Sequence, residues 1–145
     1  MERKPHSQRS AEEAEVRRGD YPHADLTESI LSAAFKVQRA LGPGLLESTY
    51  EACLAHELRK AGHHVALQVG LDITYDDLNI PGAYRMDMVV DARVVVELKT
   101  VEKLMDVHSA QLHSYLRFSG LEVGLLLNFW AWPLKEGGIR RVVKS

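Results

Sequence analysis

The chain has 145 residues and a formal net charge of −2, and 46% of its residues are hydrophobic and 26% charged. This length and composition indicate a single globular domain with a hydrophobic core. No apolar run approaches the roughly 18 residues of a membrane span, and the basic N-terminus leads into no apolar secretory signal. The single cysteine excludes an internal disulfide, so we expect a cytoplasmic protein with no membrane contact. The absence of net positive charge counts mildly against a nucleic-acid partner.

The first part of the chain is polar, and we expect residues 1–24 to form a flexible arm and residues 25–145 the folded domain. Asp25-Leu-Thr-Glu28 is a helix start signal, and apolar residues follow it at helical spacing until Gly42-Pro43-Gly44 ends the helix. A second amphipathic helix follows directly and ends at Gly62.

Beyond the second helix the hydrophobic spacing becomes that of strands. Two short strands are predicted over 65–69 and 71–75, followed by a turn at Asp76-Asp77-Leu78-Asn79. Two β-rich runs, 84–90 and 94–99, come next and are separated by three residues.

The last third of the chain returns to helix and then to strand. A helix is predicted from about Leu104 to Phe118, a fully apolar strand over 124–129, and an edge strand over 139–143. The order of helices and strands predicts a three-layer α/β domain, in which a mixed central sheet is flanked by helices.

The run Val94-Val-Val-Glu-Leu-Lys99 is hydrophobic enough for a buried strand, yet it places Glu97 and Lys99 on the same face. A buried Glu–Lys ion pair is one interpretation, and a strand end that opens into water is another. A three-residue loop before this strand would place Asp87 directly opposite Glu97, whereas a two-residue loop would put them on opposite faces.

Two facing carboxylates repel each other, and a bound cation relieves that repulsion. Carboxylate and carbonyl oxygens suit Mg²⁺ or Mn²⁺, so we expect Asp87, Glu97 and the backbone carbonyl of Leu98 to bind such an ion. The ion would polarise a phosphoryl oxygen and activate a water, and Lys99 would orient that water or offset charge on phosphorus. These residue types at this spacing predict a site for phosphodiester hydrolysis.

Asp87 and the following Glu97-Leu98-Lys99 resemble the core motif of the PD-(D/E)XK nuclease superfamily. The segment Gly44-Leu-Leu-Glu47-Ser-Thr-Tyr50 resembles the signature of the GxxExxY proteins, a branch of that superfamily, and the likeness runs from about Leu26 to Val143. It implies a restriction-endonuclease-like core and an acidic residue, Glu47, that points into the metal site. From the helix alone, Tyr50 would be core and Glu47 a solvated charge. The residue before Asp87 is methionine, so the proline of the superfamily's name is absent.

His108, Gln111 and Tyr115 share one helical stripe. Gln111 and Tyr115 resemble a Gln–Tyr pair of the nuclease branch related to recombination exonucleases, which implies that they lie near the substrate phosphate. His108 is equally well explained as a helix-capping or packing residue. Trp130 and Trp132 could stack on bases, but edge packing or a dimer contact explains them equally well.

The predicted function is hydrolysis of nucleic-acid phosphodiester bonds with Mg²⁺, and DNA is favoured because the resembled superfamily mostly cuts DNA. Lys99 would position the nucleophile, Glu47 would bind or orient the metal through water, and Gln111 and Tyr115 would support the site. The alternative is a non-catalytic nuclease-fold module that binds nucleic acid or a protein partner, and a homodimer is left open. In a third interpretation Glu97 and Lys99 form a buried pair and no metal binds.

Overall fold

The computed structural model describes residues 21–145, so most of the predicted arm over residues 1–24 lies outside the described residues. This part of the chain folds into three helices, α2 (Ala24–Leu41), α3 (Glu47–Lys60) and α4 (Asp106–Ser119). They accompany one sheet, whose strands are β1 (Val65–Tyr75), β2 (Leu78–Val90), β3 (Val94–Lys99), β4 (Val123–Asn128) and β5 (Ile139–Val143).

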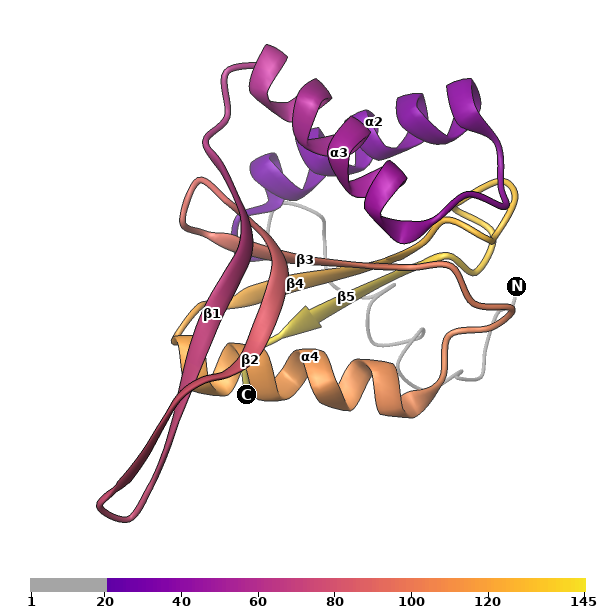
Figure 1. The fold of residues 1–145 in the computed structure, drawn as a ribbon. Coiled ribbons are helices and arrows are strands. Elements are labelled where there is room, and N and C mark those ends of the chain that lie inside the picture. Colours follow the sequence, from indigo (N-terminus) through magenta and orange to yellow (C-terminus); the bar gives the residue numbers. More distant parts are fainter. Residues whose placement is uncertain (1–20) are drawn as a thin grey trace.

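The strands lie in the order β1-β2-β3-β4-β5, and only the β3–β4 pair is parallel. Helices α2 and α3 cover one face of the sheet and α4 covers the other (Figure 1). The α4 crossover is what makes β3 and β4 parallel, since a parallel connection needs a long segment between its strands. The predicted mixed α/β fold with a flanked central sheet is confirmed.

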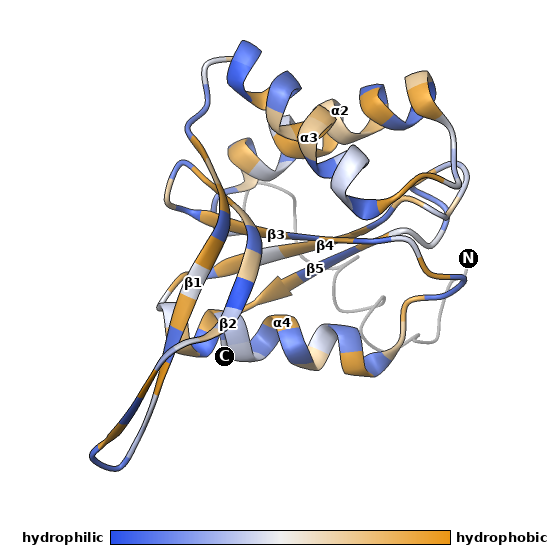
Figure 2. Ribbon diagram, in the orientation of Figure 1, coloured by the Kyte–Doolittle hydropathy of each residue, from blue (hydrophilic) through white to orange (hydrophobic). Residues whose placement is uncertain are grey.

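Two hydrophobic cores form because β3 and β4 are buried on both faces. Val94, Val96 and Leu98 pack under α2 and α3, whereas Val95 packs against α4. Figure 2 shows hydrophobic residues along much of β3 and β4, and alternating hydrophobic and hydrophilic residues on the helices. Alternation along β3 therefore places the side chain of Glu97 on the α4 side, with Val95.

The β1–β2 hairpin differs from the prediction. Residues 65–75 form one continuous strand, and β2 begins at Leu78, which pairs with Tyr75 across a two-residue turn. Pro81 and Gly82 are poor strand residues, because proline lacks a ladder donor and glycine has no side chain to pack. The structure accommodates them by a register shift in the β1–β2 ladder, and the distal part of the hairpin extends beyond the sheet as an arm (Figure 1).

Candidate active site

The β2–β3 ladder stops before either strand ends. It begins at Val90–Val94, across the three-residue loop on which the expected register depended, and its last pair is Met88–Val96. Beyond that pair, the carboxylate oxygen Oε2 of Glu97 accepts a hydrogen bond from the backbone N–H of Asp87 at 2.8 Å. Side chains thus replace the missing ladder bonds, and the Asp87 and Glu97 carboxylates are held at the point where the strands diverge.

Asp87 makes the reciprocal bond to β3. Its oxygen Oδ2 accepts a hydrogen bond from the backbone N–H of Leu98 at 3.0 Å. Asp87 is half-buried and Glu97 is 5% exposed. Burial, followed by the charge of Asp87, raises the pKa of Glu97 to about 8, although the Asp87 N–H and Lys99 both act to lower it. A cation bound between the two side chains would offset the effect of the Asp87 charge on Glu97.

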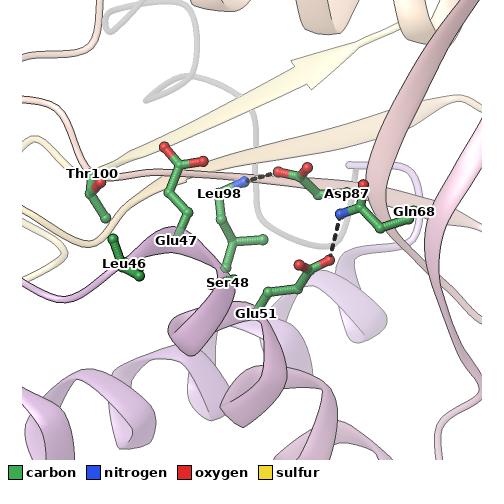
Figure 3. A pocket seen from close by; sticks show the side chains of 8 residues that line it. All are labelled: Leu46, Glu47, Ser48, Glu51, Gln68, Asp87, Leu98 and Thr100. Carbon is green, nitrogen blue, oxygen red and sulfur yellow. Dashed lines mark hydrogen bonds between the residues drawn. The ribbon is translucent and has the colours of Figure 1, made fainter.

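A pocket of about 520 Å³ opens beside Asp87, between the start of α3 and strands β1 to β3. Figure 3 shows Glu47, the first residue of α3, on the other side of Leu98 from Asp87. Glu51, one turn along α3, accepts a hydrogen bond from the side-chain amide of Gln68 at 2.9 Å. The lining residues are Leu46, Glu47, Ser48, Glu51, Gln68, Asp87, Leu98 and Thr100.

Tyr50 fixes the segment that leads into α3. Its side chain is fully buried, and its ring stacks on Phe129 with centroids 4.6 Å apart. Its hydroxyl donates to the carbonyl of Gly42 at 2.5 Å and accepts from the N–H of Leu45 at 3.2 Å. Tyr50 is therefore a core residue that positions the turn before Glu47, which gives the Gly–Glu–Tyr spacing a structural meaning.

Lys99 ends β3, where it pairs with Asn128 of β4. It is half-buried and lies on the same sheet face as Glu97. Its positive charge acts to lower the pKa of Glu97 and contributes to lowering that of His108, so both groups lie within its electrostatic reach. The strand thus carries an acidic and a basic side chain, two residues apart, on its α4 side.

Helix α4 brings one of its two predicted residues to the carboxylates. Tyr115 is buried, and burial together with the charges of Glu97 and Asp87 raises its pKa to about 12. Its ring lies 6.0 Å from that of Tyr84 on β2. Gln111, one turn earlier, is exposed, and its side chain makes no hydrogen bond within residues 21–145.

His108 is a capping residue in this structure. Its Nδ1 accepts a hydrogen bond from the N–H of Met105 at 2.9 Å, which satisfies an amide at the start of α4. Burial, then the charges of Lys99 and Arg140, lowers its pKa. The capping interpretation left open by the sequence is the one observed.

Four residues of the site region were not anticipated from the sequence. Gln68 lines the pocket from β1 with a left-handed backbone angle φ of 52°, and Glu51 is its partner. Tyr84 packs on Tyr115, and buried Asn128 exchanges two hydrogen bonds with the backbone of Val101, at 3.0 and 2.8 Å. A fully buried asparagine at a strand end was the one visible signal, because buried amides are normally paired.

The donor set fits a hard divalent ion. Asp87 and Glu97 supply carboxylate oxygens that meet between two strands, and the charge of Asp87 adds to burial in raising the pKa of Glu97. Within the described residues, no group of three His, Cys, Asp or Glu side chains is arranged to hold a metal ion. Backbone carbonyls and water would therefore complete the coordination, as Mg²⁺ commonly requires.

An acidic pair and a lysine therefore lie at diverging strands of a mixed α/β sheet, as in a nuclease-like domain. A family model described as the PD-(D/E)XK nuclease superfamily matches residues 24–142. The chain belongs to this superfamily, whose nucleases generally use divalent metal ions. Comparison with curated proteins and with solved structures gave no significant match. Within residues 21–145, no helix combines the length and the hydrophobicity needed to cross a bilayer.

Proposed function

We propose that this protein is a nuclease that hydrolyses phosphodiester bonds with Mg²⁺ or Mn²⁺ and prefers DNA. The observation that carries the proposal is the meeting of Asp87 and Glu97 where β2 and β3 separate, with Lys99 on the same face. The Gly44–Tyr50 segment supports a place in the GxxExxY branch of the superfamily. The single cysteine, Cys53, suits a cytoplasmic protein.

In this proposal Asp87, Glu97 and the carbonyl of Leu98 hold the ion, and Glu47 binds or orients it through water. When bound, the ion supplies a polarised phosphoryl oxygen and a water of lowered pKa. Lys99 positions the attacking water and offsets charge that develops on phosphorus. Tyr115 keeps its proton over the whole physiological range because its pKa is about 12, so it acts as a hydrogen-bond donor toward the carboxylates or the substrate. Gln111, on the exposed side of α4, would contact the substrate phosphate.

The second candidate is a non-catalytic module that binds nucleic acid or a protein partner. The observation in its favour is that Asp87 and Glu97 each already accept a backbone hydrogen bond from the opposite strand. In that role the two carboxylates would only complete the hydrogen bonding between β2 and β3, and the pocket would bind its partner without cleaving it.

A cleavage assay separates the two candidates. Single- and double-stranded DNA and RNA are incubated with Mg²⁺ or Mn²⁺ and either the wild type or Lys99→Ala. We expect the variant to lower the rate at least about 100-fold, the typical effect of removing a group that stabilises developing charge. Equal background cutting by both proteins would contradict the enzyme proposal for these substrates.

Metal titration by calorimetry tests the ion site independently of cleavage. Asp87→Asn keeps an oxygen for the Leu98 N–H but removes the charge, so the affinity for Mn²⁺ should fall at least about tenfold. Asp106→Asn, at an exposed acid that begins α4, is the matched control and should bind Mn²⁺ as the wild type does. Metal binding without cleavage would favour the module, and no binding at all would leave a purely structural role for the acidic pair.

A further inference from the structure

The loop that follows β4 is held in place by two buried side-chain amides. Asn128 is 1% exposed, and its oxygen Oδ1 accepts hydrogen bonds from the N–H groups of Val101 at 3.0 Å and Trp130 at 3.3 Å. This amide ties the start of the loop to the segment after β3. The loop therefore begins from a fixed point.

Gln38 of α2 holds the middle of the same loop. It is 3% exposed, its Nε2 donates to the carbonyls of Phe129 at 3.2 Å and Ala131 at 2.5 Å, and its Oε1 accepts from the N–H of Leu134 at 2.7 Å. A buried amide is tolerated only when its hydrogen bonds are made, and here all the hydrogen bonds of the Gln38 side-chain amide go to the loop. The loop backbone is thus specified by residues far away in the sequence.

This ordered loop leaves its two largest side chains in solvent. Phe129 and Leu134 are fully buried, whereas the indoles of Trp130 and Trp132 are 46% and 56% exposed. Neither indole belongs to a strand, since β4 ends at Asn128, so edge-strand packing does not account for them. A rigid loop that presents large aromatic surface is typical of a binding element.

The loop lies beside the candidate active site. The N–H of Phe129 donates to the carbonyl of Lys99 at 2.8 Å, and Asn128 is the register partner of Lys99. Figure 1 shows the loop after β4 at the same end of the sheet as the end of β3 and the start of α3. Lys135 and the adjacent Glu136 are both exposed, so the loop carries no net charge and its indoles are its main binding surface.

We infer that Trp130 and Trp132 form a stacking platform for unpaired nucleobases of the strand that enters the active site. The inference rests on the proposed nuclease function. Indoles stack on any base, and each stacked base typically raises affinity about tenfold. A duplex hides its base faces, so this platform selects single-stranded or frayed nucleic acid. Nucleic acid is favoured over a protein partner as the ligand of this platform. The reason is that Phe129, the residue before Trp130, is hydrogen-bonded to the end of β3 that carries Lys99.

The chain contains only these two tryptophans, so its intrinsic fluorescence reports directly on the platform. The Lys99→Ala protein, which should leave the strand uncut, is titrated with an oligothymidylate of about ten nucleotides. The same titration uses an abasic strand of equal length. We expect saturable quenching by the oligothymidylate and at least about tenfold weaker binding of the abasic strand.

Substitutions separate stacking from charge. In the Lys99→Ala background, Trp130→Ala with Trp132→Ala should lower oligothymidylate affinity, measured by anisotropy of a labelled strand, to that of the abasic strand. The corresponding pair of Trp→Phe substitutions should restore most of it. Tyr75→Ala removes an aromatic that is 74% exposed at the far tip of the hairpin and should have no effect.

Equal affinity for the intact and abasic strands, or unchanged binding by the double alanine variant, would overturn the inference. So would a dimer that buries both indoles, seen as a doubled mass in solution that the alanine variant abolishes. In these cases cleavage of duplex by the wild type would still support the proposed nuclease function. A wild type that neither binds nor cuts any nucleic acid would overturn both.

Discussion

Strand β3 has a different kind of partner along each of its edges. Toward β4, backbone pairing runs without interruption from Val94 to Lys99. Toward β2, it ends at the Met88–Val96 pair, and the carboxylates of Asp87 and Glu97 take up the backbone N–H groups beyond. The comparison shows why charged residues are tolerated in this buried strand. They lie where main-chain partners are missing, so each carboxylate gains a hydrogen bond that partly offsets its desolvation.

The largest change in stability should come from removing the ionisable group of Glu97, on the edge of β3 that faces β2. The folded protein keeps the proton of Glu97 up to about pH 8, whereas an unfolded chain releases it near the ordinary pKa of 4.5. The folded state therefore holds more protons between these values, and the stability of the metal-free protein falls as the pH rises through this window.

Glu97→Gln removes this titration and keeps an oxygen that can accept from the Asp87 N–H. At pH 8.5 the variant should be more stable than the metal-free wild type by about 2–4 kcal/mol, and the difference should vanish near pH 4. Urea unfolding of metal-free protein across this pH range measures it. A constant difference at all pH values would show that Glu97 does not titrate as its burial implies.

On the other edge of β3, toward β4, stability should depend on side-chain volume and not on charge. A Cβ added at Gly124, on β4, would lie 2.7 Å from the Cδ1 atom of Leu112 on α4. Gly124→Ala should therefore lower the free energy of unfolding by about 1–3 kcal/mol through overpacking, at every pH. Gly70→Ala is the matched control, because a Cβ there meets no atom within 4 Å. Denaturant unfolding measures the stability of both variants, and each should bind Mn²⁺ as tightly as the wild type. Loss of Mn²⁺ binding in Gly124→Ala would contradict the difference between the two edges of β3.

The smallest effect is expected where the pocket meets α3. Tyr50→Phe removes the hydroxyl that links Gly42 and Leu45, at a cost of about 1–2 kcal/mol for the part-buried groups left unpaired. Tyr75→Phe, at an exposed ring, should cost nothing measurable. Chemical denaturation measures the stability. The cleavage rate shows whether Glu47, which directly follows the turn held by Tyr50, keeps its position. An unchanged stability would mean that the Tyr50 hydroxyl does not hold the turn.

The sequence predicted the parts of the fold that depend on local pattern. The hydrophobic period indicated both strands around the loop after Val90, and the loop length fixed the register that brings Asp87 to Glu97. The start of α2 was less accurate, because the helix begins at Ala24 and Asp25 lies inside its first turn. Asp25 instead bonds Arg93, a partner 68 residues away that local pattern does not reveal.

Features that depend on distant contacts were beyond sequence reasoning. The extension of β2 past Tyr84 relies on pairing with β1, which outweighs the poor strand propensity of Pro81 and Gly82. The pairing of Gln68 with Glu51 joins a strand to a helix and has no periodic signature. The resemblance implied that Gln111 and Tyr115 lie near the substrate phosphate, and the structure shows Tyr115 buried and Gln111 exposed. Which residue of the helical stripe is buried depends on how α4 is rotated on the sheet, and the local sequence does not reveal that rotation.

Because the Asp87 and Glu97 carboxylates hydrogen-bond β2 to β3, binding of a metal ion by these carboxylates would be coupled to local opening of the sheet. An oxygen that coordinates a cation shares its lone pairs less fully with an amide, so loading the proposed metal would alter protection of the Asp87 and Leu98 amide protons. The same thermodynamic cycle runs in reverse: whatever loosens these two amides also changes the affinity for the cation. Hydrogen exchange at just two backbone positions would thus read out the state of the whole centre.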